Sequence, residues 1–388
     1  MISIRLGDLC ELKYGKALKK QNRMGGNIPV YGSNGIVGYH NEAAVEKPTV
    51  IVGRKGSIGE VHMVNGPSWP IDTTYYVQFK SSEVNLGWFY RLLKTLRLNE
   101  LNRSAAIPGL NRNDFYRIKI GLPLIEDQIR IATLLSRVEA LIATRRNNLQ
   151  QLDDFLKSTF LEMFGIKSGS YKEWVGDHLV DHTKIVSGVT KGKRYKSNNL
   201  IETPYMRVAN VQDGFLDLRE IKKTQVSPAD IEKYMLLKGD LLLTEGGDPD
   251  KLGRGYIWNG EIEGCIHQNH IFRVRVDDNK VLNPLFLSGL IGSIYGKSYF
   301  LRSAKQTTGI ASINSTQLKK FPLILPPIAL QNKYANVSMQ VRGSIYRCQV
   351  NLSSLEELYA ALSQKAFKGE LDLSRIPLPE KTTPPNIP

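Results

Sequence analysis

Cysteine is scarce in this sequence, and long apolar runs are missing. The 388 residues contain three cysteines, Cys10, Cys265 and Cys348. An odd number of widely spaced cysteines does not form a disulfide framework, so we expect a reducing compartment. No stretch approaches the roughly 18 apolar residues of a membrane span, and the first residues lack the apolar core of a signal peptide. The sequence therefore predicts a cytoplasmic protein without a membrane segment.

Catalytic and metal-binding signatures are missing as well. Neither Asn-Pro-Pro nor Asp-Pro-Pro occurs, so the segment with which an amino-methyltransferase holds a flipped base is absent. The segment Gly188–Arg194 is one residue short of a phosphate-binding loop and ends on arginine. Cys265, His267 and His270 have the residue types of a zinc site, but no fourth ligand is indicated. We therefore expect a chain without its own cofactor or metal.

One enzymatic alternative remains open. Asp250, Asp278 and Lys280 have the residue types of a Mg²⁺-dependent nuclease site. Asp278, however, lies in a segment that is typical of a turn rather than of a strand that positions ligands beside Asp250. The leading hypothesis is a non-catalytic binding protein. The stand-alone nuclease is the alternative, and it predicts that the purified chain cleaves DNA.

The chain does have an excess of positive charge, and this excess is unevenly distributed. The formal net charge is +15 at pH 7. Residues 1–124 contribute +8 and residues 171–326 contribute +5, whereas residues 125–170 are neutral. Two basic segments separated by a neutral one indicate a polyanion bound at two places. Nucleic acid is the leading candidate, because phosphate neutralisation releases counterions.

The chain also contains an internal repeat with a shift of 203 residues, the spacing from Gln128 to Gln331. The segment Leu122–Gln128 corresponds to Leu325–Gln331, and each copy precedes a long run in which apolar residues recur at steps of three and four. This period indicates two coiled-coil helices, which we place at residues 125–165 and 327–371. Their seam positions are Val138, Ile142, Leu149, Leu152, Leu156, Val341, Ile345, Leu352, Leu355, Tyr359 and Leu362.

A domain precedes each predicted helix, so the fold class is α+β. Residues 1–124 and 171–326 contain short β-branched runs, turn signals and helical segments, as two mixed α/β domains do. We expect the two helices to pair antiparallel with a pseudo-two-fold repeat; the alternative is that each packs on its own domain. The residues from 372 to 388 are rich in proline, and we expect a disordered tail.

Hydrogen-bond donors gather in several glycine-containing loops of both domains. Arginine and lysine neutralise phosphates, and glycine allows the backbone to approach them. The candidate DNA-binding residues are Lys19, Lys20, Asn22, Arg23, Arg54, Lys55, Ser57, Arg103, Arg112, Lys191, Lys193, Arg194, Lys196, Arg207, Gln268, Asn269, Lys305, Gln306 and Thr307. Which of them contact bases and which contact phosphates is left open.

The order of domain and helix, repeated twice, resembles the specificity subunit of type I restriction-modification systems. The resemblance depends on Leu122–Gln128 and Leu325–Gln331, on the ending Gln364–Leu371, and on Val52–Gly59 and Lys238–Leu242, which are similar to segments of such recognition domains. It covers essentially the whole chain. No single motif is specific, but the duplicated order is.

The resemblance implies a division of labour. Residues 1–124 and 171–326 would be target recognition domains that each read one half of a bipartite double-stranded DNA target, with the helices as spacer. Because the two domains differ in sequence, the target would be asymmetric. Adenine methylation would belong to two partner methyltransferase subunits with S-adenosylmethionine, and cleavage to a restriction subunit with ATP and Mg²⁺, in defence against foreign DNA. A regulator or decoy that binds DNA without partners remains a third reading.

Overall fold

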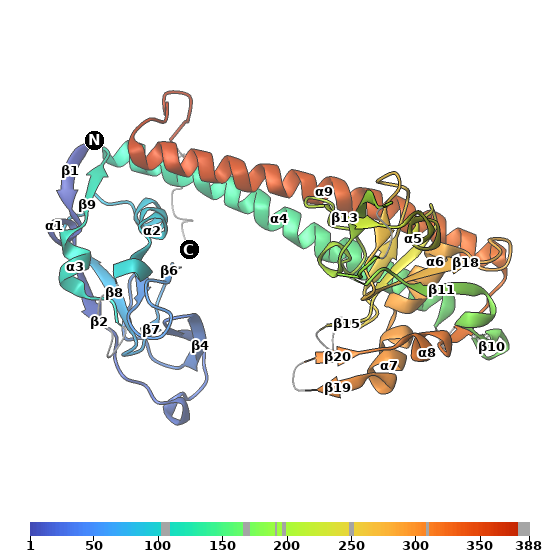
Figure 1. Cartoon of the computed structure of the whole chain (residues 1–388). Helices are drawn as coiled ribbons and strands as arrows, with labels where there is room; N and C mark the ends of the chain where they lie inside the picture. Colours follow the sequence, from blue (N-terminus) through green and yellow to red (C-terminus); the bar gives the residue numbers. More distant parts are fainter. Residues whose placement is uncertain are drawn as a thin grey trace. The chain divides into compact units, whose positions relative to one another are not determined.

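The chain folds into two compact units. The computed structural model describes residues 1–101, 109–165, 171–190, 192–195, 199–247, 252–307 and 310–378. The first unit combines Met1–Arg146 with Val350–Pro388, and the second is the continuous segment Asn147–Gln349. Each unit contains one globular domain together with part of both long helices, α4 (Ile125–Phe164) and α9 (Ile328–Lys368) (Figure 1). None of the helices in the described ranges is long and apolar enough to cross a membrane.

The first domain is built around a four-stranded antiparallel sheet. Its order is β2 (Cys10–Tyr14), β8 (Thr74–Phe79), β5 (Thr49–Gly53) and β6 (Val61–Val64). All five residues of β5 are buried, as expected for a β-branched run in the middle of a sheet. The other elements are β4 (Gly35–His40), β3 (Ile28–Gly32), β7 (Trp69–Pro70), β1 (Ile2–Arg5), β9 (Lys119–Leu122), α1 (Leu6–Leu9), α2 (Leu86–Thr95) and α3 (Arg112–Arg117).

The second domain repeats this plan. Its four-stranded sheet has the order β11 (Thr183–Ser187), β18 (Ile271–Val276), β14 (Leu241–Thr244) and β16 (Gly255–Ile257). A three-stranded sheet and a two-stranded sheet accompany it, as in the first domain. The remaining elements are β13 (Lys222–Val226), β12 (Ile201–Met206), β17 (Ile266–His267), β10 (Val175–His178), β21 (Pro322–Ile324), α5 (Pro228–Tyr234), α6 (Pro284–Gly292), α7 (Ile294–Ser303) and α8 (Ser315–Lys319).

Each of the three sheets of the first domain has a counterpart with the same strand order in the second domain. The sheet β4-β3-β7 corresponds to β13-β12-β17, because in both an antiparallel and a parallel partner flank the central strand. The pair β1-β9 corresponds to β10-β21. The second domain adds a small sheet in the order β15 (Gly246–Gly247), β20 (Ile310–Ser312) and β19 (Lys305–Thr307). The internal repeat predicted from the helix segments therefore extends to the domains.

A buried glutamine explains the first copy of the sequence motif. Gln128, in the first turn of α4, is 1% exposed. Its Nε2 donates hydrogen bonds to the carbonyls of Pro123 (3.0 Å) and Glu83 (3.1 Å), and its Oε1 accepts one from the backbone N–H of Asn85 (2.8 Å). Asn85 caps α2 by accepting from the N–H of Trp88. One side chain thus joins the start of the long helix to the start of α2.

The second copy has the same geometry. Gln331 is fully buried in the first turn of α9. Its Nε2 donates to the carbonyls of Pro326 (2.8 Å) and Val281 (3.0 Å), and its Oε1 accepts from the N–H of Asn283 (2.8 Å), the N-cap of α6. The proline before each helix and the glutamine inside it are therefore parts of one hydrogen-bonded junction.

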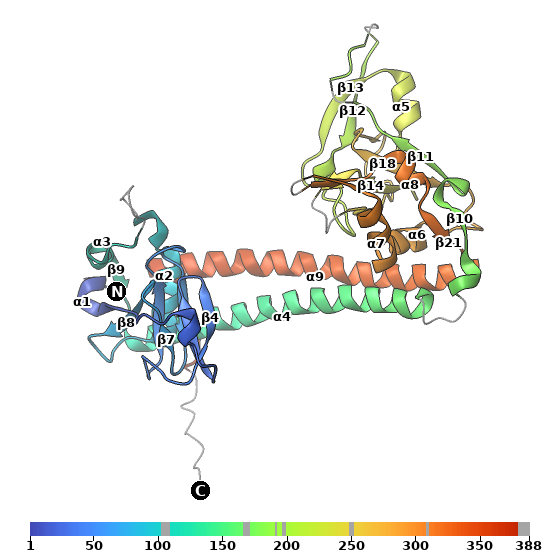
Figure 2. The ribbon, with the colours of Figure 1, turned by 90° about the horizontal axis from the view of Figure 1, so that it is seen from below.

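The long helices run antiparallel within each unit, as Figure 1 and Figure 2 show from two directions. In the first unit, the Tyr359 hydroxyl donates to Glu139 Oε1 (2.6 Å), and Arg146 pairs with Glu356 (2.6 Å). In the second unit, the ring of Phe160 lies 5.2 Å from that of Tyr334. The predicted seam residues of both helices are buried or half-buried. The predicted antiparallel coiled-coil arrangement is confirmed.

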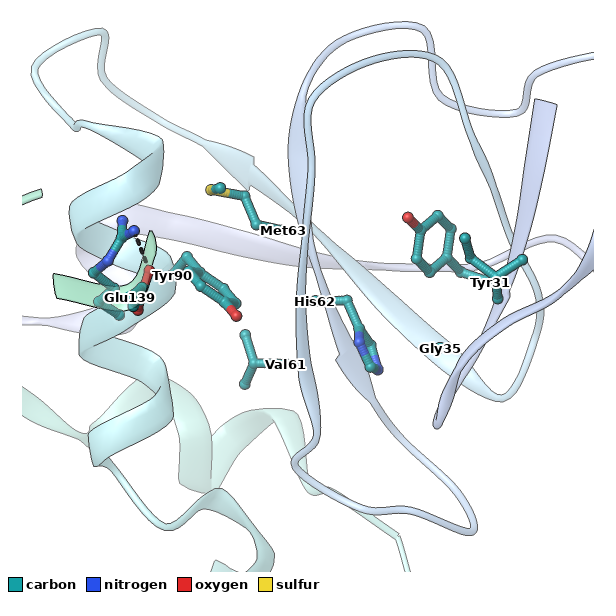
Figure 3. Close-up of a pocket in the computed structure, with 9 residues that line it drawn as sticks. Tyr31, Gly35, Val61, His62, Met63, Tyr90 and Glu139 are labelled. Carbon is teal, nitrogen blue, oxygen red and sulfur yellow. Dashed lines mark hydrogen bonds and ion pairs between the residues drawn. The ribbon is translucent and has the colours of Figure 1, made fainter. Parts of the chain in front are cut away.

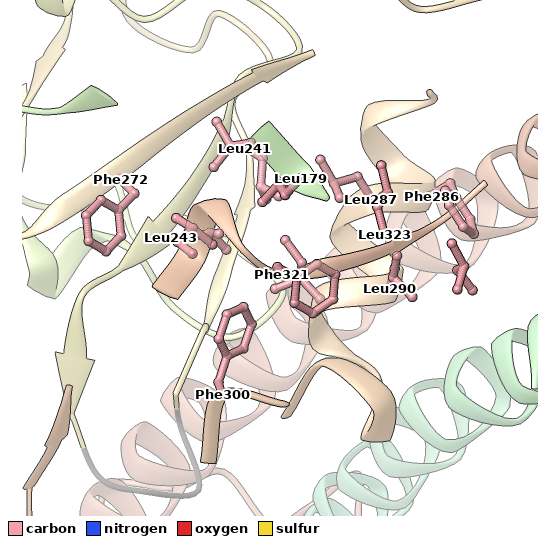
Figure 4. Packing of buried hydrophobic residues seen from close by; sticks show 14 of the residues in the cluster. Leu179, Leu241, Leu243, Phe272, Phe286, Leu287, Leu290, Phe300, Phe321 and Leu323 are labelled. Carbon is pink, nitrogen blue, oxygen red and sulfur yellow. The ribbon is translucent and has the colours of Figure 1, made fainter. Parts of the chain in front are cut away.

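The last turns of each long helix enter a domain core. Phe160 and Phe164, at the end of α4, belong to the core of the second unit, which Figure 4 shows around Phe286, Leu290 and Phe321. Ala366, near the end of α9, belongs to the core of the first unit, and the ring of Phe367 lies 6.4 Å from Trp88. The end of α4, which follows the first domain in sequence, thus belongs to the core of the second unit. The end of α9, which follows the second domain, belongs to the core of the first unit.

The first residues of the predicted tail make contacts with the first unit. Leu373 packs against the core of the first unit, and the carbonyl of Ile376 accepts a hydrogen bond from Nε of Arg130 (3.1 Å). These contacts hold the first residues after α9 on the domain, which the proline content did not indicate. Residues 379–388 lie outside the described ranges.

Candidate nucleic-acid interface

Two arginines stack on one exposed tyrosine in the first domain. Tyr14, the last residue of β2, is 50% exposed. The guanidinium of Arg112 lies 4.5 Å from its ring centroid and that of Arg54 lies 4.8 Å away; Arg54 is also 5.9 Å from the ring of Tyr75. Cation–π contacts of this kind hold a guanidinium in a fixed plane. We call Tyr14, Arg54, Tyr75 and Arg112 the arginine–tyrosine cluster.

Hydrogen bonds orient the two guanidinium groups further. Nη1 of Arg54 donates to the carbonyl of Asp72 (2.9 Å), and Nη1 of Arg112 donates to the carbonyl of Leu12 (3.4 Å). Burial raises the pKa of Tyr75 to about 12, so its ring stays neutral beside the arginines. The cluster therefore presents a preorganised positive surface, suited to phosphates or to the acceptor edge of a base.

The basic loops around this cluster are more exposed. Lys19, Lys20 and Asn22 are exposed at the short 3₁₀ helix η1 (Lys20–Asn22), whereas Arg23 donates to the carbonyl of Val37 (2.6 Å). Lys55 is exposed and Ser57 half-buried, on either side of Gly56, whose φ of +75° requires glycine. Arg103 lies outside the described residues.

In the second domain, several predicted donors have partners within the chain. Lys193 pairs with Asp230 (2.7 Å), which is 6% exposed, and Tyr195 donates to the same carboxylate. Burial alone raises the pKa of Asp230, but the hydrogen bonds from Lys193 and Tyr195 hold it below its usual value. Arg194 is exposed. Lys191 and Lys196 lie outside the described residues.

The other predicted donors of the second domain have mixed environments. Arg207 donates to the carbonyl of Glu220 (3.1 Å) and pairs with its carboxylate (3.3 Å). Gln268 and Asn269 are half-buried, and Lys305 in β19 is exposed. The side chains of Gln306 and Thr307 are not among those that the structure describes. The assignment of all these residues to DNA contacts stays a prediction.

An acidic residue occupies a position that the search for positive charge overlooked. Glu245 follows β14 directly, and its Oε2 accepts a hydrogen bond from Nδ1 of His270 (2.7 Å). Both side chains line a cavity of about 360 Å³ together with Val208, Gly246 and Ser312. Glutamate and histidine facing the same cavity can accept and donate hydrogen bonds to a polar ligand.

A second cavity, of about 430 Å³, lies in the first unit (Figure 3). Tyr31, His62 and Tyr90 line it, and an ion pair between Arg91 and Glu139 (2.5 Å) closes one side. Arg91 is only 5% exposed. Since Glu139 also accepts the hydroxyl of Tyr359, this ion pair joins α2 to both long helices and has a structural role.

His267 and Asp278, which the sequence analysis considered for a zinc site and a nuclease site, make other hydrogen bonds in the structure. Both ring nitrogens of His267 face backbone carbonyls, those of Tyr234 (3.1 Å) and Val186 (3.2 Å). Asp278 accepts the N–H of Lys280 (2.8 Å) in a turn, and Asp250 lies outside the described residues. Within the described ranges, no three His, Cys, Asp or Glu side chains form a group that could hold a metal ion. The nuclease alternative has no support.

The fold duplicates an arrangement of one domain followed by one long helix, and comparisons with known proteins show which proteins it resembles. The family model described as "Type I restriction modification DNA specificity domain" matches residues 2–153. The type I restriction enzyme StySPI specificity subunit of Salmonella potsdam is 26% identical over 323 residues, which cover 78% of this chain and 66% of that protein. The EcoKI specificity subunit of Escherichia coli is 22% identical over 71% of this chain and 62% of its own length.

Solved structures agree on the fold. The S subunit of a type I restriction-modification system from M. genitalium superposes with a TM-score of 0.63 at 17% identity, covering 94% of this chain and 96% of that one. Residues 2–153 thus match the type I restriction modification DNA specificity domain, and the chain as a whole is similar to type I restriction enzyme specificity subunits. The matched segments span less than two thirds of the length of the first curated relatives.

Proposed function

We propose that this chain is a non-catalytic specificity subunit that binds double-stranded DNA and directs partner enzymes to a bipartite, asymmetric target. Each domain contacts one half of the target. Two methyltransferase subunits carry S-adenosylmethionine and methylate adenine, and a restriction subunit carries ATP and Mg²⁺ and cleaves. The complex acts in the cytoplasm in defence against foreign DNA.

The observation that carries this proposal is the duplication of one domain fold with different polar surfaces. The strand orders of the two domains correspond, yet the first domain presents the arginine–tyrosine cluster and the second presents Glu245 with His270. Two copies of one fold that offer unlike hydrogen-bonding groups are suited to two unlike half-sites. The net charge of +15 favours a polyanionic ligand.

Genome-wide mapping of adenine methylation tests the proposal. Cells that carry the chain and its partner methyltransferase are compared with cells lacking only the chain, and with cells lacking only the methyltransferase. We expect one asymmetric two-part motif that is methylated in the first strain and unmethylated in both others. Methylation that persists without the chain contradicts the proposal, and so does a motif consisting of a single part.

A further inference from the structure

Arg54 in the first domain and Glu245 in the second occupy equivalent backbone positions. The N–H of Arg54 donates to the carbonyl of Thr73 (2.9 Å), and its own carbonyl accepts from the N–H of Leu110 (2.9 Å). The N–H of Glu245 donates to the carbonyl of His270 (3.0 Å), and its carbonyl accepts from the N–H of Ile313 (2.8 Å).

The flanking strands agree with this correspondence. The residue before Arg54 pairs with Thr74 of β8, and the residue before Glu245 pairs with Ile271 of β18. Thr73 and His270 therefore occupy equivalent positions as well. The same point in two copies of one fold carries a cation in one domain and an anion in the other.

The surroundings prepare each side chain for directional hydrogen bonds. The guanidinium of Arg54 is stacked on Tyr14 and tied to Asp72, which fixes its plane. The carboxylate of Glu245 is held through Oε2 by Nδ1 of His270. Among the contacts of the described residues, none occupies Oε1 of Glu245, and the adjoining cavity of about 360 Å³ leaves room for the edge of a ligand.

These two groups select opposite base edges. The planar arginine fork donates two hydrogen bonds and matches O6 and N7 of guanine, which are both acceptors. An ionised carboxylate only accepts, so it matches an exocyclic amino group in the major groove, which cytosine and adenine present. Guanine at the same place would set two acceptors against the carboxylate.

We propose that Arg54 and Glu245 are equivalent base-contacting residues of the two domains. Arg54 reads a guanine in one half of the target. Glu245, positioned by His270, reads a base that bears an exocyclic amino group in the other half. This inference rests on the proposed function and deepens it, since it explains why one fold reads two unlike half-sites.

Selection from a random pool of duplex DNA tests the inference. The full chain, assembled with its methyltransferase subunit, is incubated with the pool, and the bound duplexes are sequenced. For Arg54→Lys we expect the preference for guanine to relax at a single position by roughly five- to hundredfold, because the bidentate contact is lost. For Glu245→Gln, and more weakly for His270→Asn, we expect one position of the other half-site to relax.

Matched controls separate base contacts from phosphate contacts. Lys55→Ala removes an exposed cation beside Arg54 and should weaken binding to all duplexes alike, without changing the motif. Asp278→Asn removes an exposed anion of the second domain and should change neither affinity nor motif. Thermal unfolding of each variant establishes that it is folded.

The outcomes are distinguishable. If the wild-type complex selects a two-part motif and both Arg54→Lys and Glu245→Gln select the same motif with unchanged preferences, the inference is overturned and the proposed function stands. If the wild-type complex selects no motif, the proposed function itself fails and the inference fails with it.

Discussion

Burial is the main factor that determines the charge of the His267 side chain. It is fully buried, and burial lowers its pKa to about 4, although the two backbone carbonyls beside its ring favour the charged form. The same burial raises the pKa of the thiols of Cys10 and Cys265 to about 12, which keeps them protonated and unreactive. These three groups therefore belong to the core and not to a reactive site.

His267 makes stability depend on pH in a defined window. An unfolded histidine binds its proton below about pH 6.5, whereas the folded one does so only below about pH 4. The unfolded state thus binds more protons between these values, and the free energy of unfolding falls as the pH is lowered through them. We expect a loss of about 2 kcal/mol between pH 7.5 and pH 5.

Denaturant unfolding of the wild type and of His267→Gln at both pH values measures this contribution. The variant should lack that part of the pH dependence, since glutamine does not titrate. The carboxylates and the other histidines contribute equally to both proteins and cancel in the difference. An identical pH dependence of the two proteins would falsify the assignment.

Lys193 has a partner within the chain that its sequence neighbours do not indicate. Glycines and other cations surround it in the sequence, which favours a phosphate contact, and that contact stays a prediction. In the structure its ammonium group pairs with the carboxylate of Asp230, which is almost fully buried. Lys193→Met should lower the stability of the second unit by about 1 to 3 kcal/mol, because the buried carboxylate loses a charged partner.

The double variant Lys193→Met, Asp230→Asn should recover part of this loss, and Arg194→Met, at an exposed neighbour, should cause none. Thermal unfolding measures all three. Unchanged stability of Lys193→Met, together with a lower salt dependence of DNA binding, would instead favour a phosphate contact.

At the scale of elements, the two junction glutamines are the most testable feature. Gln128→Leu removes the partner of the buried Pro123 carbonyl and of two partly buried groups, the Glu83 carbonyl and the Asn85 N–H. At roughly 1 to 3 kcal/mol for an unsatisfied buried group, we expect a loss of about 1 to 3 kcal/mol in the first unit. Gln331→Leu should have the same effect in the second unit, whereas Gln151→Leu, at an exposed site of α4, should be nearly neutral. Equal melting temperatures of all three variants would disprove the role of the junction.

The long helices were predictable because their signal is local. An apolar step of three and four residues needs only neighbouring residues, so Ile125–Phe164 and Ile328–Lys368 agree with the expected ranges to within three residues at each end. The junction glutamines were recognised as a repeated motif, but their role depends on the carbonyls of Glu83 and Val281, far away in the sequence.

The arginine–tyrosine cluster could not be predicted in this way. Tyr14 and Arg112 come together only because β2 and the start of α3 lie side by side in the folded domain. A search for clustered donors finds Arg54 and Arg112, but it assigns no role to Tyr14 or Tyr75. Glu245 was overlooked for a different reason: a carboxylate does not stand out among residues selected for binding phosphate.

At the scale of the whole molecule, the first unit is discontinuous in sequence. Its core requires Ala366 and packs against Tyr359, Leu362 and Phe367, all from the C-terminal half of α9. A chain shortened after Gln349 loses these side chains, each large one contributing roughly 1.5 to 3 kcal/mol when buried. We expect the first domain of this shortened chain to be unfolded or strongly destabilised.

A chain shortened after Leu378 is the control, because it keeps every described residue. Hydrogen exchange of the β5 amides reports on the first domain, and that of the β14 amides reports on the second. Loss of protection in β5 but not in β14 is the expected result for the chain ending at Gln349. Retained protection in β5 would contradict a core shared with the C-terminal segment.

This discontinuity also determines the order in which the two units can finish folding during synthesis on the ribosome. The second unit is one continuous segment and has all its residues once Gln349 has emerged. The first domain is synthesised earlier, but its core includes residues from the last turns of α9. The domain that is synthesised first therefore obtains its last core residues after the second domain has obtained all of its own. Until then its apolar surface stays open to chaperones and proteases, and a ribosome that stops early leaves a product whose older half is the unfinished one.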